Sequence, residues 1–518
     1  MTNNFAADVL ICGAGAAGLT LAIELARRGV SFRLIERKAA PFPGSRGKGI
    51  QPRTQEVFED LGILDKVVAT GGVYPPMRDY RSDGSFIEKD LGDRSQPTSA
   101  EPYRIPLMIP QFLTEKIMRE RLAELECEVE FGCGLVGFEQ DDDGVTAHLT
   151  RSSGEERVRV RYLVGADGGR SFVRHALGIA FPGKTLGVRA IVADAALTGL
   201  DRDIWWQFNS GDMQRMIAIC PLGGTELFQI QAPVPPEGDV DLSAEGMERM
   251  IAERTDRSDI AVHSVNWASA YAMNARIADS YRVGRIFLAG DAAHTHPPTG
   301  GQGLNTSVQD SYNLGWKLAA VLRGAPHELL DSYEIERRPV AEEVLGLSSR
   351  LLDAGTRGEI SRGREVHQLD IGYPQSPLAL EAAGRTHGLR AGQRAPDAPT
   401  KGAAGQPSRL FLLFAGPHWT LLVNGQRTIA SRPGLRIHHL GERGDILDVF
   451  GCVHDAYGLA PDECVLIRPD GYVGATLLLS AQGIAQLETY LDGVGLPPLN
   501  ETSKRDAPAL DAERAQND

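Results

Sequence analysis

A chain of 518 residues is too long for one hydrophobic core, so two to three domains are expected. Its 54 Lys and Arg against 68 Asp and Glu give a net charge of −14, which disfavours nucleic acid and anionic membrane surfaces as partners. The six cysteines form no C-x-x-C pair, and neither a signal peptide nor a membrane-spanning apolar window is found, so no metal site and a cytoplasmic location are predicted.

The first elements along the chain predict a nucleotide-binding βαβ unit. A strand, a glycine-rich turn, an amphipathic helix and a second strand are expected at residues 8–12, 13–18, 19–29 and 31–37. Gly13 permits the tight turn, Gly15 lets backbone amides approach a pyrophosphate, and Gly18 allows close packing of helix and strand. Glu36 ends the second strand, where it can accept hydrogen bonds from ribose hydroxyls. The unit therefore predicts a dinucleotide site for FAD or NAD.

Two later segments place an aspartate in a glycine turn after a strand. Asp167 follows the strand at 157–164, and Asp291 follows the strand at 285–289. After Asp291 come two prolines, a glycine cluster and a helix start, which suit a ligand that carries hydroxyl groups and negative charge. Each segment alone could be an ordinary turn. Together with the first unit they predict a flavin dinucleotide.

The remaining chain divides by texture. Short alternating segments predict an antiparallel sheet, a Gly- and Pro-rich stretch predicts a connection, and Pro469-Asp470-Gly471 predicts a hairpin. The expected domains are the first part of the nucleotide-binding domain at 1–180, the antiparallel sheet at 181–275, the nucleotide-binding return segment and its helices at 276–355, the connection at 356–394, a C-terminal domain at 395–499 and a disordered tail at 500–518.

The order and residues of segments 13–18, 165–168 and 290–291 resemble the group A flavoprotein monooxygenases, a family of FAD-dependent aromatic hydroxylases. The resemblance covers residues 8 to about 345. It implies an α/β protein: a glutathione-reductase-type, Rossmann-like FAD-binding domain with an inserted antiparallel-sheet substrate domain. The phrase VLIRPDGYVG at 465–474 resembles the thioredoxin-like α/β domain of the phenol and polyketide hydroxylase branch. That domain lacks a cysteine pair here, so a structural or oligomer-contact role is expected.

The resemblance also implies which residues contact FAD. Asp291 would bind the ribityl chain, and amides around Gly303 and Leu304 would face the flavin edge. From the sequence alone, Arg46 and Gln111 would be a solvated loop arginine and a helix-start amide. The implied cofactor-binding residues are Gly13, Gly15, Ala16, Ala17, Gly18, Glu36, Arg37, Arg46, Gln111, Asp167, Gly290, Asp291, Pro298, Gly301, Gly303, Leu304 and Asn305.

The implied reaction is hydroxylation of a phenol or aromatic polyketide with NADPH or NADH and O2, through a C4a-hydroperoxyflavin. Because the chain has one dinucleotide fingerprint, FAD is expected to stay bound while the nicotinamide cofactor visits. The backbone of Pro298 and Gly301 is expected beside the reacting ring. No side-chain base for the phenol can be named, and a substrate with an acidic hydroxyl need not have one. His294 and His296 are expected to be structural.

The substrate is expected between the sheet of 181–275 and the loop of 297–301. Candidate lining residues are Trp206, Phe208, Met216, Phe228 and Tyr271, and polar candidates are Arg215, Gln229 and Gln231. Each of the lining residues could instead pack in the core. Strand alternation puts Trp206 and Phe208 on one face and Trp205 on the other, so only one set can line a pocket.

Three further expectations accompany this hypothesis. The same fold could carry out Baeyer–Villiger insertion or epoxidation, which only product analysis separates from hydroxylation. An FAD-loaded binding protein without turnover is a second alternative, although the intact proline–glycine loop beside the flavin favours turnover. A homodimer is expected as a further possibility.

Overall fold

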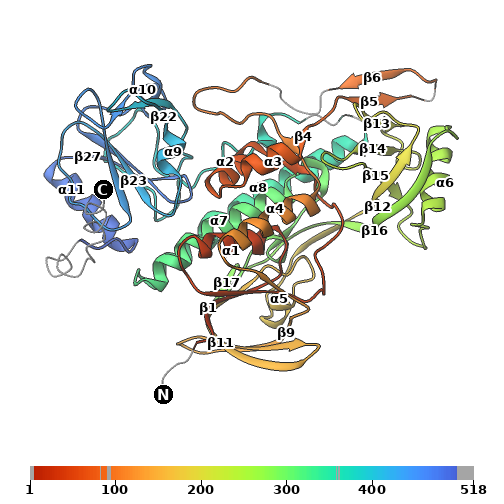
Figure 1. Ribbon diagram of the computed structural model, residues 1–518, viewed down its shortest axis with the longest axis horizontal. Coiled ribbons are helices and arrows are strands. Elements are labelled where there is room, and N and C mark those ends of the chain that lie inside the picture. Colours follow the sequence, from red (N-terminus) through yellow and green to blue (C-terminus); the bar gives the residue numbers. More distant parts are fainter. Residues whose placement is uncertain (1–4, 82, 90–94, 358, 360–361, 499–518) are drawn as a thin grey trace, which may run out of the picture. The chain divides into compact units, whose positions relative to one another are not determined.

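The computed structural model describes residues 5–81, 83–89, 95–357, 359 and 362–498 (Figure 1). The predicted tail at 500–518 lies outside the described residues. The chain forms two compact units, one made of residues 1–319 and 330–376, the other of 320–329 and 377–518. The division falls inside the predicted connection at 356–394. No helix in the described ranges combines the length and the apolar character needed to cross a bilayer.

The first sheet of the larger unit is parallel at its centre, in the order β17-β18-β11-β1-β2-β8, with β10 and β9 paired onto β11. Its strands are β1 (Ala7–Cys12), β2 (Phe32–Glu36), β8 (Val129–Phe131), β9 (Gly134–Gln140), β10 (Val145–Arg151), β11 (Gly154–Gly165), β17 (Arg282–Val283) and β18 (Ile286–Leu288). The register pairs Cys12 with Gly165 and Gly165 with Leu288. The central strands β1, β11 and β18 consist mainly of apolar residues, as expected for strands of a parallel sheet that is buried on both faces.

The larger unit also contains helices and short segments. They are α1 (Ala16–Ala26), α2 (Pro52–Asp60), α3 (Leu64–Thr70), α4 (Gln111–Glu124), α5 (Phe172–Ala176), most of α7 (Gly303–Leu322), α8 (Asp331–Thr356), η1 (Gly290–Ala292), η2 (Pro298–Gly300) and η4 (Arg364–Val366), with a small sheet of β3 (Gly49–Ile50), β7 (Leu107–Met108) and β4 (Gly72–Val73). The end of α7 and most of η3 (His327–Leu330) are assigned to the smaller unit. Gly315 of α7 lies so close to α1 that a Cβ there would meet Cβ of Glu24 at 2.7 Å. The glycine therefore lets these two helices pack closely.

The second sheet of the larger unit has the order β19-β16-β12-β15-β14-β13-β5-β6. Its elements are β5 (Met77–Tyr80), β6 (Phe86–Lys89), β12 (Gly183–Thr198), β13 (Trp205–Phe208), β14 (Ile217–Pro221), β15 (Phe228–Val234), α6 (Ala244–Thr255), β16 (Ala261–Ile277) and β19 (His294–Thr295). Figure 1 shows α6 along one face of this sheet. The strands β5 and β6 form one end of this sheet, although the predicted boundaries assign their residues to the first part of the nucleotide-binding domain.

The smaller unit contains a mixed sheet in the order β20-β27-β26-β23-β24-β25-β21-β22. Its elements are β20 (Leu380–Glu381), β21 (Pro399–Gly402), β22 (Pro407–Arg409), α9 (Leu410–Phe414), β23 (Trp419–Asn424), β24 (Leu435–Leu440), β25 (Ile446–Leu447), α10 (Cys452–Tyr457), β26 (Glu463–Ile467), β27 (Val473–Leu478) and α11 (Ala481–Gly493). The predicted turn at Pro469 joins the antiparallel pair β26–β27. Burial raises the pKa of the Cys464 thiol to about 12, and Cys464 forms no disulfide.

Candidate active site

Three strand ends meet at one edge of the first sheet. Because β1, β11 and β18 run parallel, the segments that follow them carry Gly13, Asp167 and Asp291 to the same place. The Ala166 amide donates to the Cys12 carbonyl at 2.8 Å, which locks two of the three turns together. The fold thus brings together the three segments that the sequence singles out.

The first glycine turn has no room for side chains. Gly13 has φ = 105°, and a Cβ there would lie 2.3 Å from the Ala166 carbonyl oxygen. A Cβ on Gly18 would lie 1.9 Å from the Gly13 carbonyl oxygen. Gly15 is extended and precedes Ala16 and Ala17, the buried first residues of α1. The turn therefore leads bare backbone into the start of α1, an arrangement that suits an anion.

Glu36 and Arg37 end β2 beside this turn. Glu36 accepts hydrogen bonds from the backbone amides of Ala14, at 3.1 Å, and Lys38, at 3.0 Å. Both bonds fix the carboxylate at the edge of the glycine turn, where a ribose hydroxyl can reach it. The Arg37 side chain is exposed, so its predicted contact with the cofactor stays a prediction.

The two aspartates keep polar oxygen atoms available. One oxygen of Asp167 accepts from the Val173 amide at 3.1 Å, while the other is buried without a hydrogen-bond partner. The Asp291 side chain is exposed, yet the surrounding protein raises its pKa by desolvation, against the opposing effect of His294. Exposure together with desolvation is what we expect of a carboxylate that faces a space enclosed by protein.

The loop from Gly290 to Asn305 is pinned by its last residue. Asn305 donates to the Gly301 carbonyl at 2.7 Å and to the Gly49 carbonyl at 2.9 Å, and accepts from the Gln51 amide at 2.8 Å. Gly290 and Gly301 both have φ = 62°. Pro298 is exposed between them, and Gly303 and Leu304 begin α7. These backbone bonds fix the loop at the start of a long helix.

A buried ion network supports the same loop from behind. Asp310 accepts from the Gly290 amide at 3.1 Å, from His294 Nε2 at 2.7 Å and from Arg337 Nε at 2.8 Å. Burial would raise the Asp310 pKa, but His294 and Arg337 together lower it. The His296 ring stacks on His294, and burial lowers the His296 pKa to about 3. His296 is therefore neutral at physiological pH, and His294 serves Asp310.

Gln111 joins the loop that carries Arg46 to α4. Its side-chain oxygen accepts from the Arg46 amide at 3.2 Å, and its amide nitrogen donates to Glu115 at 2.8 Å. The Arg46 side chain is exposed. Sequence reasoning missed Glu115, which is 2% exposed and lies 3.8 Å from where a Cβ on Gly15 would stand. A second carboxyl group therefore borders the glycine turn.

The second sheet corrects the prediction of the substrate-lining residues. Trp206, Phe208 and Phe228 are buried in the core between this sheet and α6. Alternation along β13 and β15 points them toward α6, away from the face that meets residues 42–48. Trp206 and Phe208 are therefore core residues, as is Phe228, and do not line the side facing the nucleotide-binding segments.

Two other candidates lie near α6. Met216 directly precedes β14, and its carbonyl accepts from Arg254 of α6 at 2.8 Å. Arg215 forms an exposed ion pair with Asp256. Neither residue lies on the central strands of the sheet.

The opposite face of the second sheet combines aromatic and polar groups. The register places Tyr271, Gln231 and Gln229 on it, together with Trp205 and Asp194, which sequence reasoning did not single out. The loop of residues 42–48 covers part of this face, because a Cβ on Gly44 would lie 2.1 Å from the Trp267 ring. Strand alternation in the sequence already separates Trp205 from Trp206 and Phe208. Alternation alone, however, does not show which face of the sheet a helix covers.

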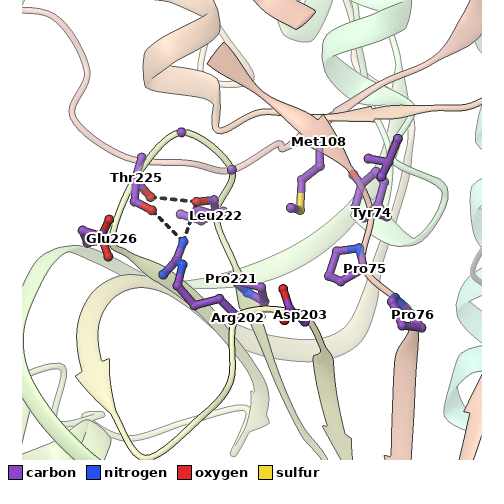
Figure 2. Close-up of a pocket in the computed structure, with 13 residues that line it drawn as sticks. Tyr74, Pro75, Pro76, Met108, Arg202, Asp203, Pro221, Leu222, Thr225 and Glu226 are labelled. Atoms are coloured by element: carbon purple, nitrogen blue, oxygen red, sulfur yellow. Dashed lines mark hydrogen bonds between the residues drawn. The ribbon is translucent and has the colours of Figure 1, made fainter. Parts of the chain in front are cut away.

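A pocket of about 590 Å³ lies at one end of this sheet. Figure 2 shows Met108 and Tyr74 on one side of it and Arg202 with Leu222 and Thr225 on the other. Arg202 donates to the Thr225 carbonyl at 2.6 Å and the Leu222 carbonyl at 3.0 Å, so its guanidinium already serves the β14–β15 turn. The pocket is separate from the three strand ends and shares only its Tyr74 and Met108 wall with the aromatic face.

Comparison with known proteins shows the family to which the chain belongs. The family model described as FAD binding domain matches residues 6–348. A flavin-dependent monooxygenase of Mycobacteroides abscessus is 40% identical over 477 residues, which cover 90% of this chain and 96% of that protein. The chain belongs to this family of FAD-dependent monooxygenases.

The monooxygenase is similar to further proteins over almost its whole length. The 6-methylpretetramide 4-monooxygenase of Streptomyces rimosus is 34% identical over 522 residues, 90% of each chain. The solved structure of aklavinone-11 hydroxylase with FAD and aklavinone matches with a TM-score of 0.83 and 28% identity, covering 95% of this chain and 99% of that one. The predicted aromatic-hydroxylase resemblance and α/β fold class are thereby confirmed.

The residues of the monooxygenase fit FAD. At Gly13 and Gly18 the backbone packs so closely that only glycine fits, and this bare turn leads directly into the start of α1. Asp167 has a buried oxygen without a partner, and Asp291 has an exposed carboxylate, as hydroxyl-rich parts of a ligand require. The fixed backbone before α7 would offer amides to the flavin edge.

The affinity of the monooxygenase for FAD is expected to fall as the pH rises through about 7. Burial raises the pKa of Glu115 to about 7, so this carboxyl is neutral below that pH and charged above it. The charged form would repel the pyrophosphate, by no more than about tenfold in affinity per pH unit. The dissociation constant measured from flavin fluorescence between about pH 6 and pH 8 tests this.

Two variants separate Glu115 from other titrating groups. Glu115→Gln is expected to bind FAD with little dependence on pH in this range. Glu120→Gln is the matched control, because Glu120 lies on the same helix but pairs with Lys116 at the surface. An unchanged slope in Glu115→Gln would exclude this carboxyl as the cause.

Proposed function

We propose that this monooxygenase hydroxylates a phenolic, fused-ring aromatic compound of the polyketide type, with NADPH or NADH and O2. The observation that carries the proposal is the buried face of the second sheet that bears Trp205, Tyr271 and Gln229 and is partly covered by the loop at 42–48. Aromatic rings there can stack on a planar substrate, and amides can orient its oxygens. The 6-methylpretetramide and aklavinone enzymes named above support this substrate class.

The chain's own residues would bind the cofactor, orient the substrate and shield the reaction from water. Bound FAD would supply the redox chemistry, which is acceptance of a hydride from NADPH or NADH and activation of O2. The glycine turn of Gly13 and the carboxylate of Asp291 would hold the cofactor, with Asp167 between them. Amides at the start of α7 would stabilise negative charge at the flavin edge. The buried aromatic face would exclude water and hold the substrate ring in place.

A substrate screen with the FAD-loaded protein tests the proposal. Small phenols and fused-ring hydroxyquinones are compared by the rate of NADPH and NADH oxidation, by release of peroxide and by the mass of products. The fused-ring compounds are expected to accelerate oxidation and to give products one oxygen heavier. Slow oxidation that no aromatic compound accelerates would instead indicate an FAD-binding protein without turnover, and inserted or epoxidised products would indicate the other oxygenation reactions.

Three expectations from the sequence stay predictions. A homodimer, a cytoplasmic location and a structural role for the C-terminal unit fit a biosynthetic or degradative enzyme of this kind. Light scattering of the purified FAD-loaded protein is the direct measurement of the oligomeric state.

A further inference from the structure

A buried lysine stands on the aromatic face of the second sheet. Lys48 is 7% exposed, and its Nζ donates to Gln229 Oε1 at 2.9 Å. The same nitrogen lies 4.2 Å from the centroid of the Trp205 ring. Lys48 forms no ion pair within the described part of the chain, and its charged form is supported by the Gln229 amide, the Trp205 ring and the nearby Cys220 thiol.

The charges around Lys48 do not compensate its burial. Desolvation lowers its pKa and is the largest effect. Cys220 opposes it, and weaker effects of Arg362 and Asp194 lower and raise the pKa respectively. Burial raises the pKa of Asp194 to about 6, so its attraction weakens at lower pH. Arg362 itself donates to the Thr299 carbonyl at 2.6 Å, and so connects the surroundings of Lys48 with the loop from Gly290 to Asn305. Burial of this amine therefore makes it easier to deprotonate than a lysine at the surface.

Several polar atoms beside Lys48 lack a protein partner. Both carboxylate oxygens of Asp194, the Ser45 hydroxyl and the Trp205 indole nitrogen are buried without a hydrogen bond of good geometry, although the nearby Ser45 and Gln229 lower the Asp194 pKa against the larger effect of burial. Buried polar atoms without partners are costly. The cluster of Lys48, Asp194, Ser45 and Trp205 therefore has hydrogen-bonding capacity to offer a polar ligand.

We propose that Lys48 binds the ionisable hydroxyl of the aromatic substrate and takes its proton, with Gln229 as the positioning residue. The O–H bond breaks, its electron pair stays on the substrate oxygen, and the amine lone pair forms the new N–H bond. The result is an ammonium–phenolate pair over the Trp205 ring. The phenolate ring is richer in electrons and so more reactive toward an electrophilic oxygen. This assignment rests on the proposed hydroxylation.

The two neighbouring tyrosine side chains are less suited than Lys48 to accept the proton of the substrate. Burial raises the pKa of Tyr271 to about 12 and that of Tyr74 further, so both stay protonated. Tyr74 stacks on Trp205 at a centroid distance of 5.7 Å and serves as wall. Lys48 is thus the group on this face with a nitrogen lone pair within reach of a proton.

Alizarin, a fused-ring hydroxyquinone whose colour reports its ionisation, is the probe. The FAD-loaded wild type is expected to bind it as the anion about one pH unit or more below the pH at which the free dye ionises. Lys48→Met is expected to bind the dye about 10- to 100-fold more weakly and in its neutral form. Lys48→Arg should bind the anion but lose the rise of turnover with pH that a titrating amine produces.

Two further variants keep the test decisive. Lys66→Met is the control, because Lys66 is an exposed lysine paired with Glu124, and it should match the wild type. Gln229→Leu leaves the amine in place but unheld, and should raise KM and shift the ionisation of the bound dye. FAD content and thermal unfolding of each variant show that it is folded.

The outcomes separate this assignment from the proposed function. Anionic dye bound equally by the wild type and Lys48→Met would overturn the role of Lys48, while phenol-stimulated NADPH oxidation would still support hydroxylation. A wild type that no phenol or hydroxyquinone stimulates would overturn the hydroxylase proposal itself. Loss of the anionic dye signal in Lys48→Met, with the signal kept in Lys66→Met, supports the role of Lys48.

Discussion

The Gly13→Ala variant is expected to be purified with little or no FAD. A Cβ at this position would lie 2.3 Å from the Ala166 carbonyl, and the backbone has φ = 105°, where a side chain is strained. Relief requires the turns after β1 and β11 to move apart, which opens the site for the pyrophosphate. Strain of about 1–3 kcal/mol at this point corresponds to a loss of FAD affinity of about tenfold or more. The ratio of flavin to protein absorbance after dialysis measures it.

Gly493→Ala is the matched control for that substitution. Gly493 ends helix α11, and a Cβ there would meet nothing within 4 Å. Alanine favours a helix over glycine, so this variant should retain FAD and be as stable as the wild type or slightly more so. Full FAD retention by Gly13→Ala would mean that the turn at β1 does not cradle the cofactor.

The Arg337→Met variant is expected to lose about 3–5 kcal/mol of unfolding free energy, because it leaves Asp310 buried with one fewer cation. Arg337 is fully buried and also donates to the Tyr373 hydroxyl at 2.8 Å. Since Asp310 holds the Gly290 amide, the loop beside Asp291 should loosen as well. Denaturant unfolding and FAD retention, measured on the same preparation, report both effects.

Arg338→Met is the neighbouring control. The Arg338 side chain is partly exposed and pairs with Glu342 one turn further along α8. An exposed pair of this kind contributes about 0–1 kcal/mol, so this variant should unfold nearly as the wild type does. Equal stability of the two arginine variants would contradict the supporting role given to the Asp310 network.

The FAD-binding segments could be predicted because their requirements are local. Gly13 and Gly18 must be glycine for backbone reasons, and Asp167 and Asp291 each follow their own strand. The parallel order of the strands then brings these local signals to one edge. This part of the fold could therefore be predicted from local sequence signals, which the parallel register of the strands brings together.

The substrate side could not be predicted in the same way. Alternation in β13 separates Trp205 from Trp206, but the choice of face depends on α6, which lies more than thirty residues further along the chain. Lys48 meets Gln229 across 181 positions of sequence, and no local pattern announces that contact. The role of Asp310 could not be predicted either, because a single aspartate inside a helix acquires its role only from the loop and the helix packed against it.

The fate of molecular oxygen tests the central claim most directly. FAD-loaded protein is mixed with NADPH, a fused-ring phenol that accelerates oxidation, and isotopically labelled O2 in ordinary water. A monooxygenase acting as a hydroxylase should give a product that carries one labelled oxygen atom on the ring. A product without the label, or NADPH consumed entirely to peroxide with the phenol recovered unchanged, would contradict the account.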